Sequence, residues 1–241
     1  MSHFKPHMEI IPPPQQQLWR ELKPSIRLGL VLYGGTAIGL RLGHRPSVDF
    51  DFFTDKPLER ETLDEAFPFL KKYIVIQQQP HTLTVLVPTH EAEGRGAPQQ
   101  SVKLSFFGNL DIGRIDIPEL TEDGVLNVAS LDDLMATKLK VLLQRIEAKD
   151  YKDIAAMLEA GVSLARGLAG ASQMYKGAFQ PSESLKALVY FEGGDLDLLT
   201  TRERKVLIGA AQEVRHLPSV TWISGLSIPE NTGLFKNLPG R

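Results

Sequence analysis

The segment at residues 48–53 constrains the fold most, because its sequence, Val-Asp-Phe-Asp-Phe-Phe, alternates apolar and acidic side chains up to Phe52. A period of two predicts a β-strand with one buried face and one open face. The buried face would carry Val48, Phe50 and Phe52, and the open face Asp49, Asp51 and Phe53. We therefore expect a sheet with an apolar back and two carboxylates on its front.

The two carboxylates have the spacing of a cation site. Asp49 and Asp51 are two residues apart on one strand, so their Cα atoms would lie about 7 Å apart and their oxygens can converge on one ion. Hard oxygen ligands favour Mg²⁺ (or Mn²⁺), which proteins bind through few carboxylates together with substrate phosphates. The alternative interpretation of these two residues is a strand whose polar face is simply solvated.

A glycine turn precedes this strand. The apolar residues 30–33 end at Gly34-Gly35-Thr36, and residues 36–42 have helical spacing. Glycines at such a turn let backbone N–H groups approach phosphate, and a helix N-terminus favours anions. The residues that would hold a nucleotide are Gly34, Gly35, Thr36, Arg41, Arg45 and Ser47. A plain chain reversal, solvated arginines, an Arg45–Asp49 pair and a strand start at Ser47 remain open as alternatives.

The patterns in the rest of the chain predict strands followed by helices. Further strands are expected at residues 73–79, 82–87, 101–107 and 125–128, a loop at 90–100, and a lead-in outside the core at 11–17. Helices are expected at residues 18–28, 58–73, 131–146, 149–161, 164–176, 182–191 and 201–214, whereas 217–241 has no assignment. This order predicts an α+β protein, with a sheet domain at 1–128 and a mainly helical domain at 129–241.

A second group of charged residues lies on two of these helices. Lys138 falls in the first helix after the strands, and Asp150 and Asp153 are three residues apart on one face of the next. Lysine and aspartate are common at helix starts, and Asp150 can equally be an N-cap. Ser130, with Asp133 three residues later, predicts a cap for the first of these helices.

Composition excludes several classes of protein. The chain has no cysteine, which excludes disulfides, zinc–thiolate sites and thiol catalysis. Its net charge of -2 lacks the basic excess of proteins that grip long duplexes. The six histidines show no metal spacing. No apolar run approaches a membrane span and no secretory signal is present, so we expect no membrane partner and a cytoplasmic location.

The motif from Gly34 to Phe53 resembles motif I of the DNA-polymerase-beta-like nucleotidyltransferase superfamily. The Arg-Leu-Gly-His-Arg-Pro-Ser-Val-Asp lead-in at residues 41–49 is most similar to the AbiEii/AbiGii-type nucleotidyltransferase toxins. The resemblance spans residues 30–158 and implies a polymerase-beta-like mixed sheet with flanking helices. It implies that Asp49 and Asp51 bind a divalent metal and that the glycine turn binds the triphosphate.

The same resemblance assigns roles to the second charged group. The toxins share a helical lysine, an arginine and a Lys-Asp-x-x-Asp stretch, which here correspond to Lys138, Arg145 and residues 149–153. Lys138 would hold a phosphate, and Asp153 would complete the acidic pocket or orient Lys138. One departure concerns the third carboxylate of the superfamily. Ser105 stands where that aspartate is expected, and Asp111 and Asp116 come too late in the chain to replace it.

These features predict a Mg²⁺-dependent transfer of a nucleoside monophosphate from an NTP to an acceptor hydroxyl. Asp49, Asp51, Lys138 and Asp153 are the expected catalytic residues. The resemblance implies a toxin that acts on RNA, such as a tRNA end, and pairs with an antitoxin protein. Transfer to a small molecule or a protein is an alternative. The missing third carboxylate leaves a non-catalytic nucleotide-binding module as another.

Overall fold

The computed structural model describes residues 2–89 and 100–227. Its strands are β1 (His3–Phe4), β2 (Val31–Tyr33), β3 (Asp49–Phe53), β4 (Ile74–Gln79), β5 (Thr82–Pro88), β6 (Ser101–Phe107), β7 (Glu119–Thr121) and β8 (Asn127–Val128). Within the described ranges they form one sheet in the order β1-β7-β8-β2-β3-β6-β5-β4. The sheet is mixed, because β3 pairs with β6 in parallel and with β2 in antiparallel. The predicted α+β mixed sheet is therefore confirmed.

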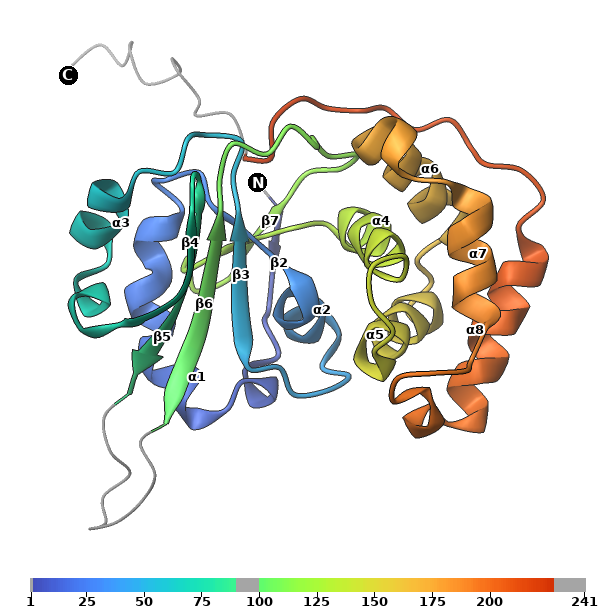
Figure 1. The fold of residues 1–241 in the computed structure, drawn as a ribbon, viewed down its shortest axis with the longest axis horizontal. Helices are drawn as coiled ribbons and strands as arrows, with labels where there is room; N and C mark the ends of the chain where they lie inside the picture. The colour runs from blue at the N-terminus through green and yellow to red at the C-terminus, as the bar shows by residue number, and fades with distance from the viewer. Residues whose placement is uncertain (1, 90–99, 228–241) are drawn as a thin grey trace, which may run out of the picture.

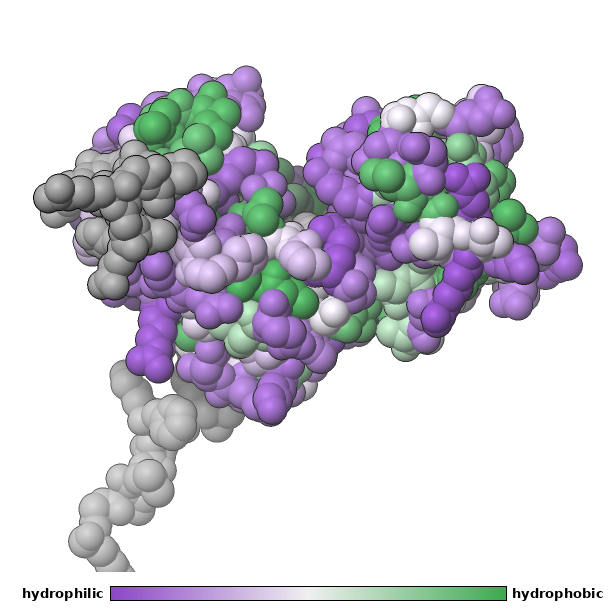
Figure 2. All heavy atoms as spheres, turned by 90° about the horizontal axis from the view of Figure 1, so that it is seen from below, coloured by the Kyte–Doolittle hydropathy of each residue, from purple (hydrophilic) through white to green (hydrophobic). Residues whose placement is uncertain are grey.

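The helices follow the order that the sequence predicts. They are α1 (Pro13–Leu18), α2 (Gly34–Leu42), α3 (Arg60–Ala66), α4 (Leu131–Val141), α5 (Ala148–Glu159), α6 (Leu164–Tyr175), α7 (Pro181–Val189) and α8 (Thr201–Glu213). Figure 1 shows α1 and α3 on one face of the sheet and α2 with α4 and α5 on the other. The last three helices form an outer block beyond α4 and α5. In the view of Figure 2 a notch separates the sheet side from this helical side.

Strand β3 has the two faces that its alternation predicts. Phe50 and Phe52 are fully buried. Phe52 stacks on Phe106 of β6 with ring centroids 5.5 Å apart, and Trp19 packs against Phe50 at 6.5 Å. Val48 is 54% exposed because it lies before the strand begins. Burial of this apolar face against the α1 side leaves Asp49 and Asp51 on the side of α2 and α4.

Several predicted boundaries are wrong. The lead-in at residues 11–17 enters α1 and the core, since Ile11 is buried and Gln15 donates to the Val48 carbonyl at 2.6 Å. The expected helix at 18–28 is a 3-10 segment, η2 (Trp19–Ser25), with Pro24 inside it. The expected helix at 58–73 breaks before Pro68 into α3 and η3 (Pro68–Lys72), because proline lacks the N–H that a continuous helix needs.

Other differences concern short or terminal segments. Helix α4 stops at Val141 rather than residue 146, and the chain turns there to bring α5 back along α4. Strands β1 and β7 were not predicted; with two and three residues they are too short to show a period. The expected loop at 90–100 lies outside the described residues except for Gln100, as do residues 228–241 of the unassigned segment.

The described end of the chain returns to the sheet side. Figure 1 shows this segment running back from α8 over the top of the molecule. Arg114 pairs with Ile223 as an antiparallel bridge, and the Trp222 indole donates to the Ile112 carbonyl at 2.9 Å. The division into domains at residue 128 stays a prediction. No helix among the described residues is long and apolar enough to span a membrane.

The cap at the start of α4 contains a buried carboxylate that makes the stability of the protein depend on pH. Ser130 caps the helix as predicted, its hydroxyl accepting from the Asp133 N–H at 3.0 Å. The carboxylate of Asp133 is fully buried and accepts from the Ile115 N–H at 2.7 Å. Burial raises the pKa of Asp133 from 3.8 to about 6. The folded state therefore binds this proton more tightly, and the stabilisation is lost as pH rises through that interval.

We expect Asp133→Asn to remove this dependence, because asparagine keeps the shape and the acceptor but does not titrate. Between about pH 4 and pH 7 the free energy of unfolding of the wild type should fall by up to about 3 kcal/mol relative to the variant. Urea unfolding of both proteins at several pH values measures the difference. A difference that does not change with pH would contradict the raised pKa.

Candidate active site

A cavity of about 620 Å³ lies between the front of the sheet and helix α4. The sheet contributes Asp49, Asp51, Lys103 and Ser105, and the turn before α2 contributes Gly34 and Gly35. Arg45 and Ser47 line it from the segment that leads into β3, and Lys138 lines it from α4. The structure thus brings most of the predicted site residues to one cavity, from segments up to about a hundred residues apart.

The two carboxylates lie side by side on the cavity face of β3 but in different surroundings. Asp49 is about one-third exposed and accepts from the Lys103 ammonium at 2.8 Å. Asp51 lies deeper, and burial raises its pKa; Ser105 hydrogen-bonds to it and lowers the pKa, whereas the charge of Asp49 raises it. Two carboxylates held close in a partly dry site repel each other, so a cation between them would relieve that repulsion.

The glycine turn allows an unusually close approach of the backbone to this acidic pair. Gly34 has φ +77°, and a Cβ built on it would lie 2.6 Å from Oδ2 of Asp51. A Cβ on Gly35 would lie 2.6 Å from a guanidinium nitrogen of Arg45. Tyr33, the N-cap of α2, gives no side-chain hydrogen bond to the first turn. The uncapped N–H groups of α2 therefore start beside the carboxylates and face a site suited to anions.

Two of the predicted nucleotide-binding residues do not line the cavity. Thr36 is buried, and its hydroxyl bonds to the Asp49 carbonyl and to the Ser47 hydroxyl, so it fixes the turn to β3. Arg41 points to the opposite side of α2. Its guanidinium donates to the carbonyls of Ala129 and Val128 and pairs with Glu119. The structure therefore does not bring Thr36 or Arg41 to the cavity.

The second charged group forms a buried ion network beneath the cavity. Lys138 donates to Asp150 at 2.6 Å and to Asp153 at 2.7 Å. Arg45 makes a two-pronged contact with Asp153, at 2.6 and 2.8 Å. Asp150 and Asp153 are fully buried. The network holds the Lys138 ammonium at the wall of the cavity and joins α4, α5 and the lead-in to β3.

His44 and Arg145 complete the network. His44 donates from Nε2 to Asp153 at 2.7 Å, and Arg145 donates to Asp150 at 2.8 Å. Burial raises the pKa of Asp153, but the His44 hydrogen bond and the charges of Lys138 and Arg45 outweigh burial and hold it well below its usual range. Burial likewise raises the pKa of Asp150, and Arg145 and Lys138 lower it. Both carboxylates are therefore ionised at neutral pH.

Comparison with known proteins places the chain in a family. The family model described as "Nucleotidyl transferase AbiEii toxin, Type IV TA system" matches residues 17–221. The chain belongs to the AbiEii family. An uncharacterized protein of Aquifex aeolicus (strain VF5) is 30% identical to it over 139 residues, or 55% of this chain and 61% of that protein. The chain thus spans less than two thirds of this relative's length.

Two crystal structures from Helicobacter pylori share the fold. JHP933 has a TM-score of 0.56 at 20% identity, covering 82% of this chain and 89% of JHP933. A protein described as a candidate nucleotidyltransferase has a TM-score of 0.55 at 20% identity, covering 82% of this chain and 92% of its own. These similarities confirm the polymerase-beta-like fold that the AbiEii resemblance implies.

The Gly34 contact leads to a prediction for the AbiEii turn. Gly34→Ala would place a methyl group against Asp51, and the resulting shift of the carboxylate should lower activity about 100-fold. Gly161→Ala is the matched control, because Gly161 also has positive φ, at +88°, but has nothing within 4 Å of an added Cβ. Both variants should lose stability from the positive φ, and Gly34→Ala should lose at least as much as Gly161→Ala because its methyl group also meets Asp51; urea unfolding measures both losses. Equal activity in the two would mean that the close approach to Asp51 is unimportant.

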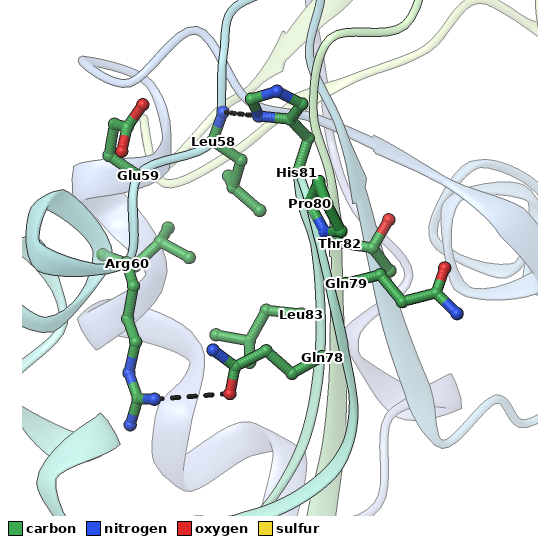
Figure 3. A pocket seen from close by; sticks show the side chains of 10 residues that line it. Leu58, Glu59, Arg60, Gln78, Gln79, Pro80, His81, Thr82 and Leu83 are labelled. Carbon is green, nitrogen blue, oxygen red and sulfur yellow. Dashed lines mark hydrogen bonds between the residues drawn. The ribbon is translucent and has the colours of Figure 1, made fainter.

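A second cavity, of about 640 Å³, lies between the start of α3 and the β4–β5 turn (Figure 3). Arg60 reaches Gln78 across it at 3.3 Å, and the Leu58 N–H donates to His81 at 3.3 Å. Glu59 is the only carboxylate in its lining. Because this cavity lacks a carboxylate pair and a buried ion network, the site between β3 and α4 is the better candidate for the AbiEii active site.

The sequence prediction missed Lys103. Strand β6 pairs with β3 in parallel, with Lys103 opposite Asp49 and Ser105 opposite Asp51. The signal was available, since residues 103 and 105 are two apart on a strand, as residues 49 and 51 are. What the sequence did not give was the pairing of the two strands, which are separated by two further strands along the chain.

Proposed function

We propose that this chain is a metal-dependent nucleotidyltransferase that moves a nucleoside monophosphate from an NTP to an acceptor hydroxyl. The observation that carries the proposal is the meeting of three features in one cavity. These are the Asp49–Asp51 pair, the uncapped start of α2 at Gly34-Gly35, and the Lys138 ammonium. A phosphate chain needs cations and N–H donors, and a divalent metal needs carboxylates, so the cavity supplies what each requires.

The residues present fit a divalent metal. Asp49 and Asp51 face one cavity from adjacent positions of one strand face, and their mutual repulsion favours a cation there. Mg²⁺ (or Mn²⁺) would be held by these two carboxylates together with the triphosphate. When bound, the metal would neutralise charge that develops on the phosphate oxygens. We further propose Arg45 and Ser47, which lie beside Gly35 and line the same cavity, as nucleotide contacts.

The side chains and backbone groups of the protein position the substrates and neutralise the negative charge that develops during the reaction. The acceptor oxygen forms a bond to the α-phosphorus, the bond from that phosphorus to the bridging oxygen breaks, and pyrophosphate leaves with the electron pair. The proton of the acceptor hydroxyl passes to solvent water. The N–H groups at Gly34-Gly35 and the Lys138 ammonium stabilise the charge that moves onto the leaving pyrophosphate. Asp150 and Asp153 keep Lys138 at that place.

We propose RNA, such as a tRNA end, as the acceptor and an antitoxin protein as the partner. The support is the family description of a toxin in a type IV system, together with the cationic side chains of the cavity wall. The cavity is lined by two carboxylates and by five cationic side chains, Arg45, Lys103, Lys138, Arg145 and Lys149. Each of these cations also pairs with a carboxylate, so the lining offers a polyanionic acceptor ammonium and guanidinium donors rather than a net positive charge. NTP and RNA as substrates imply a cytoplasmic location.

The test combines purified protein, Mg²⁺, each labelled NTP in turn and total cellular RNA. We expect label in a discrete RNA band for one NTP, and on the order of 10³-fold less in Asp49→Asn, because loss of a metal ligand removes several kcal/mol of transition-state stabilisation. Circular dichroism of the variant should match the wild type. Full activity in Asp49→Asn would overturn the metal assignment.

Ser105 favours a second candidate, a nucleotide-binding module without turnover. Opposite Asp51 this chain has a neutral hydroxyl where the superfamily has a carboxylate. Binding of NTP without transfer to RNA, protein or small molecules would favour this candidate. Label in a product other than RNA would instead identify a small-molecule or protein acceptor.

A further inference from the structure

The site lacks a third acidic group on the strand next to β3. Ser105 is the register partner of Asp51 and is 2% exposed. Within the described residues no group of three or more histidine, cysteine or acidic residues could hold a metal. Two-metal sites keep their ions about 3.5–4 Å apart and stabilise both the attacking and the leaving oxygen. Two carboxylates are few ligands for a pair of such ions.

The Lys103 ammonium lies beside the acidic pair, where a second divalent ion would otherwise be needed. It is the register partner of Asp49 on the same face of the sheet, and its Nζ lies 2.8 Å from Oδ2 of Asp49. The side chain is 39% exposed and lines the cavity, so the ammonium faces the space that a substrate would occupy. A lysine ammonium is a compact point charge that can serve a phosphate oxygen.

The other cations of the cavity have different partners. Lys138, Arg45 and Arg145 pair with the buried carboxylates Asp150 and Asp153. Lys149 pairs with Glu147 at 2.6 Å. Among the five cationic side chains of the lining, Lys103 therefore differs in being paired with a carboxylate of the acidic pair itself.

We infer that the Lys103 ammonium takes the place of a second divalent ion, so that the site works with one metal held by Asp49 and Asp51. The inference rests on the proposed nucleotidyl transfer. The Lys103 ammonium stabilises negative charge at the α-phosphate as the new oxygen–phosphorus bond forms. The bonds made and broken, and the release of the proton to water, are those of the proposed transfer.

The first test counts metal ions. The protein is saturated with an NTP analogue that has a methylene group between the α- and β-phosphorus, and titrated with Mn²⁺. Bound Mn²⁺ is counted by electron paramagnetic resonance. We expect one ion per chain without spin coupling, and at least tenfold weaker binding in Asp49→Asn. Two spin-coupled ions in the wild type would overturn the role of Lys103 and leave the proposed function intact. No ion bound, or equal binding in Asp49→Asn, would overturn the metal site and the inference together.

The second test removes the ammonium. Lys103→Met should lower kcat about 100- to 1000-fold, as loss of one preorganised charge contact does, while one Mn²⁺ still binds. Lys103→Arg, which keeps a cation, should recover part of the rate. Lys186→Met is the matched control, because Lys186 is exposed and pairs with Glu183 on the distant helix α7. The double variant Lys103→Ala/Ser105→Asp should bind a second, spin-coupled Mn²⁺. Unchanged kcat in Lys103→Met would overturn the inference.

Discussion

Asp153→Ala should lower the free energy of unfolding by about 3–5 kcal/mol, because it leaves Arg45 and His44 without their carboxylate and the buried Lys138 with one carboxylate instead of two. Asp153 is fully buried and accepts hydrogen bonds from His44, Arg45 and Lys138. Its pKa lies below the usual value of 3.8, so this stabilisation is present at neutral pH. It should be lost as pH falls below 3.8 towards the folded-state pKa. Urea unfolding at pH 7 measures the effect.

The matched control for this variant is Glu183→Ala. Glu183 pairs with Lys186 at 2.9 Å on the surface of α7, where both side chains are more than half exposed. Exposed pairs contribute about 0–1 kcal/mol, so this change should be small. A loss in Asp153→Ala no larger than in Glu183→Ala would show that the network beneath the cavity does not hold the helices to the sheet.

Asp51→Asn should have opposite effects on activity and stability. The carboxylate is partly buried, and this burial raises its pKa, which means that folding disfavours its charged form. Asparagine has the same shape without the charge, so we expect the variant to have a higher melting temperature at pH 7. The contribution of this position to stability should then no longer depend on pH. Nucleotidyl transfer should fall on the order of 10³-fold, because one of the two proposed metal ligands is lost.

The control for Asp51→Asn is Asp64→Asn. Asp64 lies on α3, away from the cavity, and makes a surface pair with Arg60 at 3.6 Å. This change should alter neither activity nor stability by much. A lower melting temperature in Asp51→Asn would mean that the charge of Asp51 stabilises the fold, and that the carboxylate pair is a structural rather than a functional feature.

The sequence predicted the elements whose periodicity is complete within one segment. The alternation at residues 48–53 gave β3 and its two faces, and the glycine turn gave the junction of β2 with α2. Helices α5 to α8 lie within a few residues of their predicted ranges. Capping supported the start of α4, where Ser130 accepts from the Asp133 N–H as expected.

What the sequence could not give depends on contacts between distant segments. Nothing in the local sequence distinguishes Arg41 from Arg45 as a nucleotide contact. In the structure, Arg41 lies on α2 and pairs with Glu119, whereas Arg45 follows α2 and pairs with Asp153. The parallel pairing of β3 with β6 sets Lys103 beside Asp49, and no local pattern specifies that pairing. The break before Pro68 could have been predicted, because proline lacks the backbone N–H that a continuous helix needs, even though the surrounding residues have helical spacing.

The position of the label on the NTP tests the central claim most directly. The protein is incubated with Mg²⁺ and total RNA, together with the same NTP labelled either at the α- or at the γ-phosphate. Nucleotidyl transfer predicts that the α-label enters the acceptor and that the γ-label leaves in pyrophosphate. Transfer of the γ-label to the acceptor, or transfer of neither label to any acceptor, would contradict the account.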